Sequence, residues 1–512
     1  MLNPPATVPG AVGFPPEETA SLDRVRRARR PFARRPAAAV RVEGRGMSIG
    51  ALWVLVACTV PGIAMLIPPL STVDLGYGIR AGEIMLDTHE VLRVDPFGLA
   101  TAGGPWLNQQ WGAEVVFALV FRAGGWQAMV VTRALLFCLI SCLVYAACRA
   151  RGASTRTSAL LTIGSFVVAL GLDLRAELLG MTLFALTVWM VAIRHRRPAV
   201  LWLVPAVVAV WSNVHGSFFL GPLLVGLAFL EDRTERPSSA RRTLVVVAVS
   251  LAAASANPFG LGVWPYVLGL STNRQVTQTV TEWAPTTIRT PIGVLFFASA
   301  LGVGWFIGRR RGAVPSVSLL AIGLFFVGGL WAIRGVSWWA LAVPPIVAGL
   351  LPEAQRADRT AGRREPVNAV LAGMVLLLAV ASLPWWRTLD RPPEALLRVA
   401  PAELTEELRG IVRPGTRMFN PQTWGSWFEL SLPAQPVFVD SRVEVAPPHV
   451  WRDYVAISRA EAGWEEVVER WGFDVIVAAR SEQGALVDAL QGREGWRAVY
   501  EDEQGVVFVR GG

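Results

Sequence analysis

"STVDLGYGIRAGEIMLDTHEVLRVDPF", residues 71–97, carries five acidic residues and two arginines, although the whole chain has a formal net charge of +9. This stretch directly follows the apolar run 49–70, which is long enough to cross a membrane. Arginine collects on the cytoplasmic side of membrane proteins. We therefore expect the acidic stretch to lie on the outer side, immediately after the first crossing.

The composition of the chain is typical of a polytopic membrane protein. Of its 512 residues, 53% are hydrophobic and 17% are charged, and the mean hydropathy is +0.43, which is too apolar for an ordinary soluble multidomain protein. The chain contains no lysine, and its arginines form no clustered soluble face, which argues against nucleic acid as a partner. The four cysteines lie in apolar segments, without zinc spacing or a disulfide pattern.

Residues 1–47 have a different character, because they are rich in Pro, Ala and Arg and lack an apolar core. Such a composition cannot bury enough surface to order itself, so we expect a disordered, arginine-rich cytoplasmic tail. A cleavable signal peptide is not expected. The first apolar run starts only near Ile49, is long enough to span and has no obvious cleavage site.

The apolar runs predict a bundle of about eleven transmembrane helices within residues 48–384. The crossings are expected near 49–70, 127–148, 157–172, 177–193, 199–213, 217–230, 243–256, 291–308, 314–331, 336–351 and 367–384. Connections expected on the cytoplasmic side are rich in arginine, as in "RHRRP", "EDRTERPSSARR" and "GRRRG". This alternation predicts a cytoplasmic N-terminus, a first outer loop at 71–126 and an extracytoplasmic C-terminus.

Most of the unusual polar residues fall on the outer side of this topology. They are Asp74, Asp95 and Glu114 in the first outer loop, Asp173, Arg175 and Glu177 in the second, Asn213 and His215 in the third, and Glu282 in the fourth. Ionisable groups at membrane depth are costly, and they tend to be functional when they converge on a cavity. The pattern therefore predicts a site that faces outward.

Several segments, taken in order, resemble the GT-C class of integral-membrane glycosyltransferases. They are "VDLGYGIRAGEIML", "VDPFGLATAGGPWLNQQWGAEVVF", "LWLVPAVVAVWSNVHGSFFLGPL", "ANPFGLGVWPY" and "TEWAP". Within that class the chain is most similar to bacterial relatives of dolichyl-phosphate-mannose protein mannosyltransferases and of lipid A aminoarabinose transferases. The resemblance covers roughly residues 50 to 385, with its strongest parts in 71–122 and 200–222.

The resemblance implies a GT-C-like helical bundle in a bacterial plasma membrane. It also implies an enzyme that moves a sugar from a polyprenyl-phosphate-linked donor to an extracytoplasmic acceptor, which is a cell-envelope glycan, a lipid or a protein. Asp74 matches the acidic residue of the first outer loop that is usually taken as the catalytic base, and Asp95 and Glu114 match recurrent positions. One departure is Leu75, which stands where the mannosyltransferase branch commonly has a second acid.

Such a transfer requires three features of the site: a base, a cation and an apolar groove. A carboxylate must deprotonate the acceptor hydroxyl, and Asp74 is the expected base. A cation must neutralise the leaving phosphate, for which we expect Arg175 or Arg334. The membrane lipid and the donor's polyprenyl chain need an apolar groove, which the outer half of the bundle is expected to supply.

Further residues are expected to line the substrate cavity or to bind a metal. The cavity residues are Tyr77, Asn213, His215, Glu282 and Trp283. No cofactor is certain, but a divalent metal is a candidate to share the neutralisation of the phosphate, with Asp74, Asp95, Glu114 and His215 as the candidate oxygen and imidazole ligands.

Several of these residues also have a structural interpretation, and Asp74, immediately outside a crossing, could simply be solvated at the interface. Asp95 precedes a proline and so is typical of a turn, and Glu114 is suited to a helix N-terminus. Asn213 and His215 could satisfy backbone groups freed at a break in an apolar segment. Asp173, Arg175 and Glu177 could simply pair with one another, and Trp283 could belong to an interfacial aromatic belt.

Residues 385–512 alternate amphipathic helical patterns with short β-rich runs, which predicts an extracytoplasmic α/β domain. In "VFVDSRVE" we expect a strand that ends at Asp440, with Arg442 and Glu444 beside it. We expect these charges to form a structural salt bridge or to contact an acceptor.

Two other classes of function are compatible with the sequence. A transporter or flippase for lipid-linked sugars would also use charges between helices, although no paired repeats are evident. A catalytically inactive GT-C-like scaffold or assembly protein is favoured by Leu75, because the second acid is missing from that position.

Overall fold

The structure is a computed structural model that describes residues 46–169, 173–273, 281–310, 312, 314–351 and 364–511. The chain divides into two compact units, Met1–Arg45 and Gly46–Gly512. The first unit lies outside the described residues. The disordered tail expected at 1–47 therefore falls almost entirely outside them as well, and so does most of the arginine-rich connection after residue 351.

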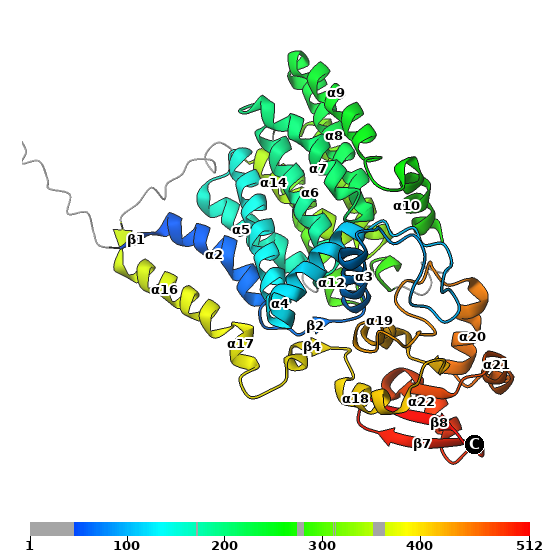
Figure 1. The fold of residues 1–512 in the computed structure, drawn as a ribbon. Helices are drawn as coiled ribbons and strands as arrows, with labels where there is room; N and C mark the ends of the chain where they lie inside the picture. The colour runs from blue at the N-terminus through cyan, green and yellow to red at the C-terminus, as the bar shows by residue number, and fades with distance from the viewer. Residues whose placement is uncertain are drawn as a thin grey trace, which may run out of the picture. The chain divides into compact units, whose positions relative to one another are not determined.

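Every expected crossing coincides with a helix of the second unit (Figure 1). These helices are α2 (Ile49–Ala64), α4 (Trp111–Ala150), α5 (Thr155–Val168), α6 (Ala176–Ile193), α7 (Val204–Trp211), α8 (Leu220–Glu235), α9 (Pro237–Ala253), α12 (Pro291–Gly308), α13 (Ser316–Trp331), α14 (Gly335–Gly349) and α16 (Pro366–Ala381). Short elements join them, namely the 3₁₀ turns η1 (Pro198–Leu203), η2 (Gly216–Phe219), η3 (Gly260–Gly262) and η4 (Thr281–Trp283), and the helices α10 (Val263–Thr272) and α17 (Pro384–Arg387). The antiparallel pair β1 (Met47–Ser48) and β3 (Arg364–Glu365) joins the starts of α2 and α16.

Three of the described helices are long and apolar enough to cross a membrane, namely α4, α6 and α12. Several others are apolar but shorter, so the expected count of eleven crossings stays a prediction. Large apolar side chains stand exposed on the bundle, for example Leu301 of α12 at 75% and Leu377 of α16 at 68%. Soluble proteins rarely present apolar faces of this kind, so these faces indicate contact with lipid.

The first outer loop expected at 71–126 contains two helical segments. One is α3 (Leu75–Thr88), and the other is the first part of α4. Within α4 the backbone leaves helical geometry at Gly124 and Gly125, where Gly125 has φ 57°, a value that favours glycine. The expected crossing at 127–148 begins directly after this kink.

The C-terminal residues form a small α/β arrangement. Its four-stranded sheet has the order β5-β6-β8-β7, with β5 parallel to β6 and the remaining neighbours antiparallel. The strands are β5 (Met418–Phe419), β6 (Val475–Ala479), β7 (Trp496–Glu501) and β8 (Gly505–Arg510), and the helices are α18 (Ala402–Ile411), α19 (Gln422–Ser431), α20 (Pro448–Ser458), α21 (Trp464–Trp471) and α22 (Arg480–Leu490). The prediction of a strand that ends at Asp440 is wrong, because this segment forms only an isolated bridge between Val437 and Gly98.

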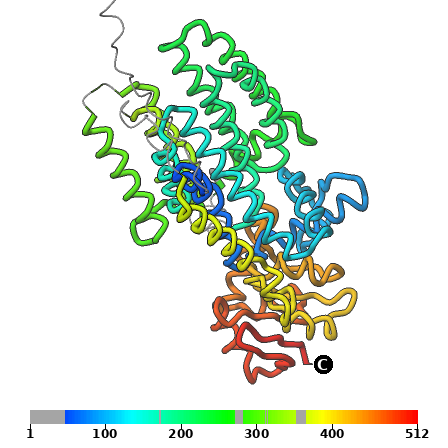
Figure 2. The backbone as a smooth tube through the Cα atoms, turned by 90° about the vertical axis from the view of Figure 1, so that its left-hand side faces the viewer, coloured from blue at the N-terminus to red at the C-terminus, as the bar shows by residue number. Residues whose placement is uncertain are grey.

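The C-terminal residues pack directly on α3, at one end of the helices (Figure 2). The strand β2 (Leu70–Ser71) pairs in parallel with β4 (Leu397–Arg398), which follows η5 (Pro393–Leu396). The backbone N–H of Tyr77 donates to Ser426 Oγ of α19 at 2.7 Å. A Cβ atom at Gly76 would lie 2.2 Å from the carbonyl oxygen of Ser426, so only glycine permits this approach.

Candidate functional site

Three distant segments bring charged side chains together at the start of α3. Asp74 precedes α3, Arg175 precedes α6, and Glu282 lies in η4. Arg175 Nε lies 3.2 Å from Asp74 Oδ2, and its Nη1 atom pairs with Glu282 Oε1. One guanidinium thus joins two carboxylates from opposite halves of the bundle sequence.

A second arginine extends this group. Arg334 Nη2 lies 3.6 Å from Glu177 Oε2, and its Cζ atom stands 4.6 Å from the centre of the Trp283 ring, a distance suited to a cation–π contact. The backbone N–H of Arg334 also donates to the Glu282 carbonyl at 3.2 Å. We call Asp74, Arg175, Glu177, Glu282 and Arg334 the Asp74 cluster.

The Asp74 cluster is partly open to its surroundings. The side chains of Asp74, Arg175 and Arg334 are 32%, 27% and 24% exposed. The pKa of Glu282 is raised because burial, with the carboxylates of Glu177 and Asp74 nearby, outweighs the arginines. A ligand can therefore reach these groups, while the surroundings remain dry enough to strengthen charge interactions.

Leu75 is fully buried and belongs to the main apolar core. The second carboxylate beside Asp74 comes instead from Glu282, through their shared partner Arg175. Leu75 thus replaces an acid, but the site still has two carboxylates, because Asp74 and Glu282 both pair with Arg175.

A separate, buried group surrounds Arg442. Its guanidinium donates to Asp95 at 2.9 Å, to Asp440 and to Glu429 at 3.3 Å. The rings that face its Cζ atom are Trp106 at 4.6 Å, Phe97 at 5.0 Å and Tyr77 at 5.3 Å. We call Arg442 and these six residues the Arg442 cluster. It ties the first outer loop to the C-terminal residues.

Asp95 is fully engaged inside the Arg442 cluster. Its carboxylate accepts from the backbone N–H groups of Phe97 and Gly98 at 3.1 and 3.2 Å and from the Thr101 hydroxyl. Only 1% of Asp95 is exposed. This placement favours the interpretation of Asp95 as the residue that fixes the turn before Pro96.

Glu114 and Tyr77 are also buried. Glu114 Oε2 accepts from Asn108 Nδ2 at 2.6 Å, whereas its Oε1 atom has no hydrogen-bond partner among the described residues. Tyr77 Oη accepts from Gln110 Nε2 at 2.7 Å. Neither residue contacts the ion pairs of the Asp74 cluster directly.

Asn213 and His215 satisfy local groups at the break between α7 and α8. Asn213 Oδ1 accepts from Trp111 Nε1 at 2.8 Å, and its amide donates to the carbonyls of Ala209 and Ala256. His215 Nδ1 lies 2.7 Å from Ser217 Oγ. These contacts favour the structural interpretation of both residues.

The four candidate metal ligands do not gather. Asp74, Asp95, Glu114 and His215 each have a different partner. Among the residues that the structure describes, no three His, Cys, Asp or Glu side chains form a group suited to a metal ion. This arrangement does not fit a shared metal centre built from those four residues.

Sequence reasoning missed two arginines that organise the fold. Asp173 does not pair with Arg175 or Glu177, as one interpretation held. Instead it accepts from Arg133 Nη1 at 3.0 Å and from Arg398 Nη2 at 2.9 Å. The signal for Arg133 was an arginine inside an apolar run, and such residues usually have a partner. For Arg442, the sequence predicted only a structural salt bridge among the neighbouring charges or a contact with an acceptor, and not the bonds to Asp95 and Glu429.

Comparison with known proteins gives a distant likeness in fold. No protein-family model and no curated protein matches the sequence. Similar solved structures include those of the oligosaccharyltransferase of Archaeoglobus fulgidus, in its apo form, tethered to an acceptor peptide, and in complex with an inhibitory peptide and a dolichol-phosphate. Each has 13% sequence identity and a TM-score of 0.48, over 90% of this chain and 74% of that chain.

At this identity and TM-score, the likeness does not extend to the residues or the chemistry of the site. The function is therefore inferred from the Asp74 cluster itself.

Proposed function

We propose that this protein is a membrane glycosyltransferase that moves a sugar from a polyprenyl-phosphate-linked donor to an extracytoplasmic acceptor. The observation that supports the proposal most is the Asp74 cluster, in which a partly exposed carboxylate lies 3.2 Å from an arginine at one end of an apolar helical bundle. A base and a phosphate-binding cation side by side are what this transfer needs.

In the proposed reaction, Asp74 accepts the proton of the acceptor hydroxyl. The acceptor oxygen then forms a bond to the anomeric carbon, while the bond between that carbon and the phosphate oxygen breaks. The electron pair leaves with the phosphate, which departs as polyprenyl monophosphate. No general acid is required, because the phosphate is a stable anion.

Arg175 and Arg334 are proposed to bind the donor phosphate. A guanidinium has five N–H donors, and the Asp74 and Glu282 pairs of Arg175 leave others available. Glu282 holds Arg175, and the ring of Trp283 supports Arg334. In this proposal Asp95 and Glu114 stabilise the loop that carries Asp74, and a divalent metal stays a candidate that a chelator in the transfer assay tests.

Replacing Arg175 with glutamine is expected to weaken donor binding at least about tenfold, because a charge-assisted hydrogen bond to phosphate is lost. The measurement is the affinity of the purified protein for polyprenyl-phosphate-mannose. Arg289→Gln is the matched control, because Arg289 is exposed and follows η4 in the same connection. Equal affinities of the Arg175→Gln variant and the unmodified protein would remove Arg175 from the donor site.

Lowering the pH from 7.5 to 5.5 is expected to strengthen donor binding by a factor of about five. The raised pKa of Glu282 means that its carboxylate takes up a proton at a higher pH than an ordinary glutamate, which releases Arg175 for the phosphate. The donor is a phosphodiester, whose charge does not change in this range. In the Glu282→Gln variant the pH dependence should disappear; its persistence would assign the effect to another group.

A further inference from the structure

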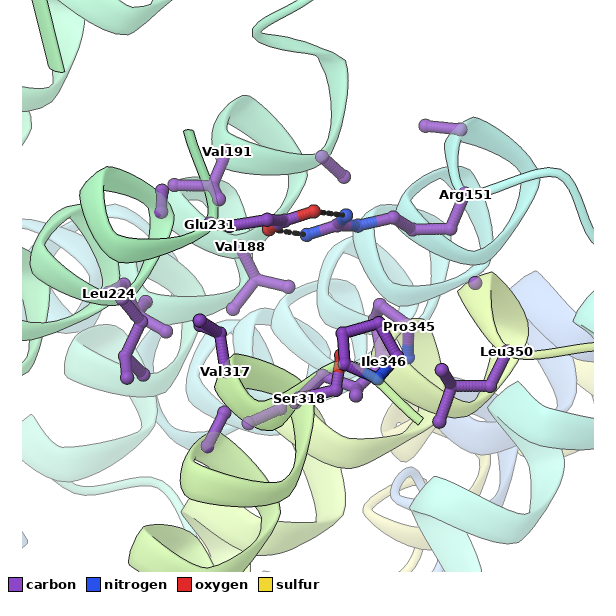
Figure 3. A pocket seen from close by; sticks show the side chains of 18 of the residues that line it. Arg151, Val188, Val191, Leu224, Glu231, Val317, Ser318, Pro345, Ile346 and Leu350 are labelled. Atoms are coloured by element: carbon purple, nitrogen blue, oxygen red, sulfur yellow. Dashed lines mark hydrogen bonds and ion pairs between the residues drawn. The ribbon is translucent and has the colours of Figure 1, made fainter. Parts of the chain in front are cut away.

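A cavity of about 510 Å³ lies between α6, α8, α13 and α14 (Figure 3). Its lining residues from α6 belong to the end of that helix that is away from the Asp74 cluster. The helix α6 begins beside Arg175, and its C-terminal residues, among them Val191, line the cavity. An 18-residue helix such as α6 is about 27 Å long, so the two sites are separate. The volume lies within the range of about 300–1,000 Å³ that is typical of ligand sites.

The inner wall of the cavity is apolar. Val188, Leu224, Phe325, Ala342 and Ile346 contribute to it from four helices, α6, α8, α13 and α14. Figure 3 shows several of these side chains directed toward the space between the helices. Such a wall suits a hydrocarbon chain.

One ion pair crosses the polar side of the cavity. Arg151 Nη1 and Nη2 donate to the two oxygens of Glu231 at 2.7 and 3.2 Å, as Figure 3 shows. His195 also lines this side, but burial and the neighbouring Arg194 lower its pKa to about 4, so it is neutral at pH 7. Neither Arg151 nor His195 therefore provides free positive charge.

The unpaired charges of the lining are Arg196, Arg236 and Glu235. All three are exposed, and among the described residues none of them forms an ion pair. The net charge of these three residues is positive. The same end of the bundle also carries the exposed Arg233 and Arg241. The cavity thus combines an apolar interior with a basic rim.

We propose that this cavity binds an anionic phospholipid, with its phosphate at Arg196 and Arg236 and an acyl chain against the apolar wall. Basic pockets between transmembrane helices on the cytoplasmic side bind anionic lipid head groups, and the arginine-rich connections at this end are the ones expected on that side. A free phosphate would use the rim alone and leave the apolar wall without a partner. This site is independent of the donor site proposed at Asp74.

The test compares lipid retention by the full-length protein in detergent, measured by native mass spectrometry. We expect phosphatidylglycerol to be retained in preference to phosphatidylcholine of the same chain length. The double variant Arg196→Gln/Arg236→Gln should bind phosphatidylglycerol about 30-fold more weakly. The matched control Arg233→Gln/Arg241→Gln removes the same charge from the same end without touching the cavity, and it should bind as the unmodified protein does.

A second variant separates the acyl chain from the head group. Ser318→Trp should fill the cavity at its wall while every charge stays in place, and it should weaken binding of the long-chain lipid but not of a dibutyryl analogue. The proposal is overturned by equal retention of the two lipid classes, or by equal losses in the two double variants. It is also overturned if inorganic phosphate competes as well as the lipid, because the site would then be a phosphate site. The thermal unfolding midpoint of each variant checks that it is folded.

Discussion

Replacing Asp74 with asparagine is expected to lower the rate of sugar transfer about 10²–10⁴-fold. Asparagine has nearly the same shape as aspartate but cannot accept the proton of the acceptor hydroxyl. The side chain is 32% exposed and has one ion-pair partner, Arg175, so the fold should tolerate the change. The measurement is the initial rate of transfer at saturating donor by purified protein in proteoliposomes.

Asp87→Asn is the matched control for this experiment. Asp87 lies near the end of the same helix, α3, is 64% exposed and pairs with Arg122 on the surface. Its replacement should change the rate by no more than about twofold, because exposed ion pairs contribute little. Transfer by the Asp74→Asn variant at the rate of this control would show that Asp74 is not the base.

Replacing Arg442 with methionine is expected to lower the free energy of unfolding by about 3–5 kcal/mol. Burial and the neighbouring Asp440 raise the pKa of Glu429 well above its usual range, so Glu429 holds a proton more readily than an ordinary glutamate does. Asp95 and Asp440 then hold the negative charges that Arg442 compensates. Without the guanidinium, two buried carboxylates lose their partner, and thermal unfolding in detergent measures the loss.

The control for the buried group is Arg409→Met. Arg409 pairs with Glu406 on the exposed face of α18, and the loss should be below about 1 kcal/mol. If both variants unfold at the same temperature, the Arg442 cluster does not stabilise the contact between the first outer loop and the C-terminal residues.

The positions of the helices could be predicted from the sequence, because each apolar run has to form a helix to satisfy its backbone in lipid. The helical structure within the first outer loop could not be predicted. The helix α3 is amphipathic rather than apolar, and its buried face packs against α4 and against α19, some 350 residues later in the chain. The inner face of α3 is therefore set by packing with both helices.

The candidate site could be predicted in part. Sidedness selected Asp74, Arg175, Glu177 and Glu282, and the need for a cation at the leaving phosphate added Arg334. The structure brings these five residues together. Sidedness could not separate them from Asp95 and Glu114, which share the same loop but lie in buried surroundings. The pairs join residues about 100 positions apart, as in Arg175 with Asp74, so they depend on how the helices pack.

Incubating the purified protein with polyprenyl-phosphate-linked sugars and an acceptor, and measuring both products, tests whether the protein is a glycosyltransferase. We predict polyprenyl monophosphate and glycosylated acceptor in equal amounts, with both products lost in the Asp74→Asn variant. A donor that remains intact with every sugar and acceptor would contradict the claim and favour a scaffold. A donor that crosses the proteoliposome membrane unchanged would contradict it and favour a transporter.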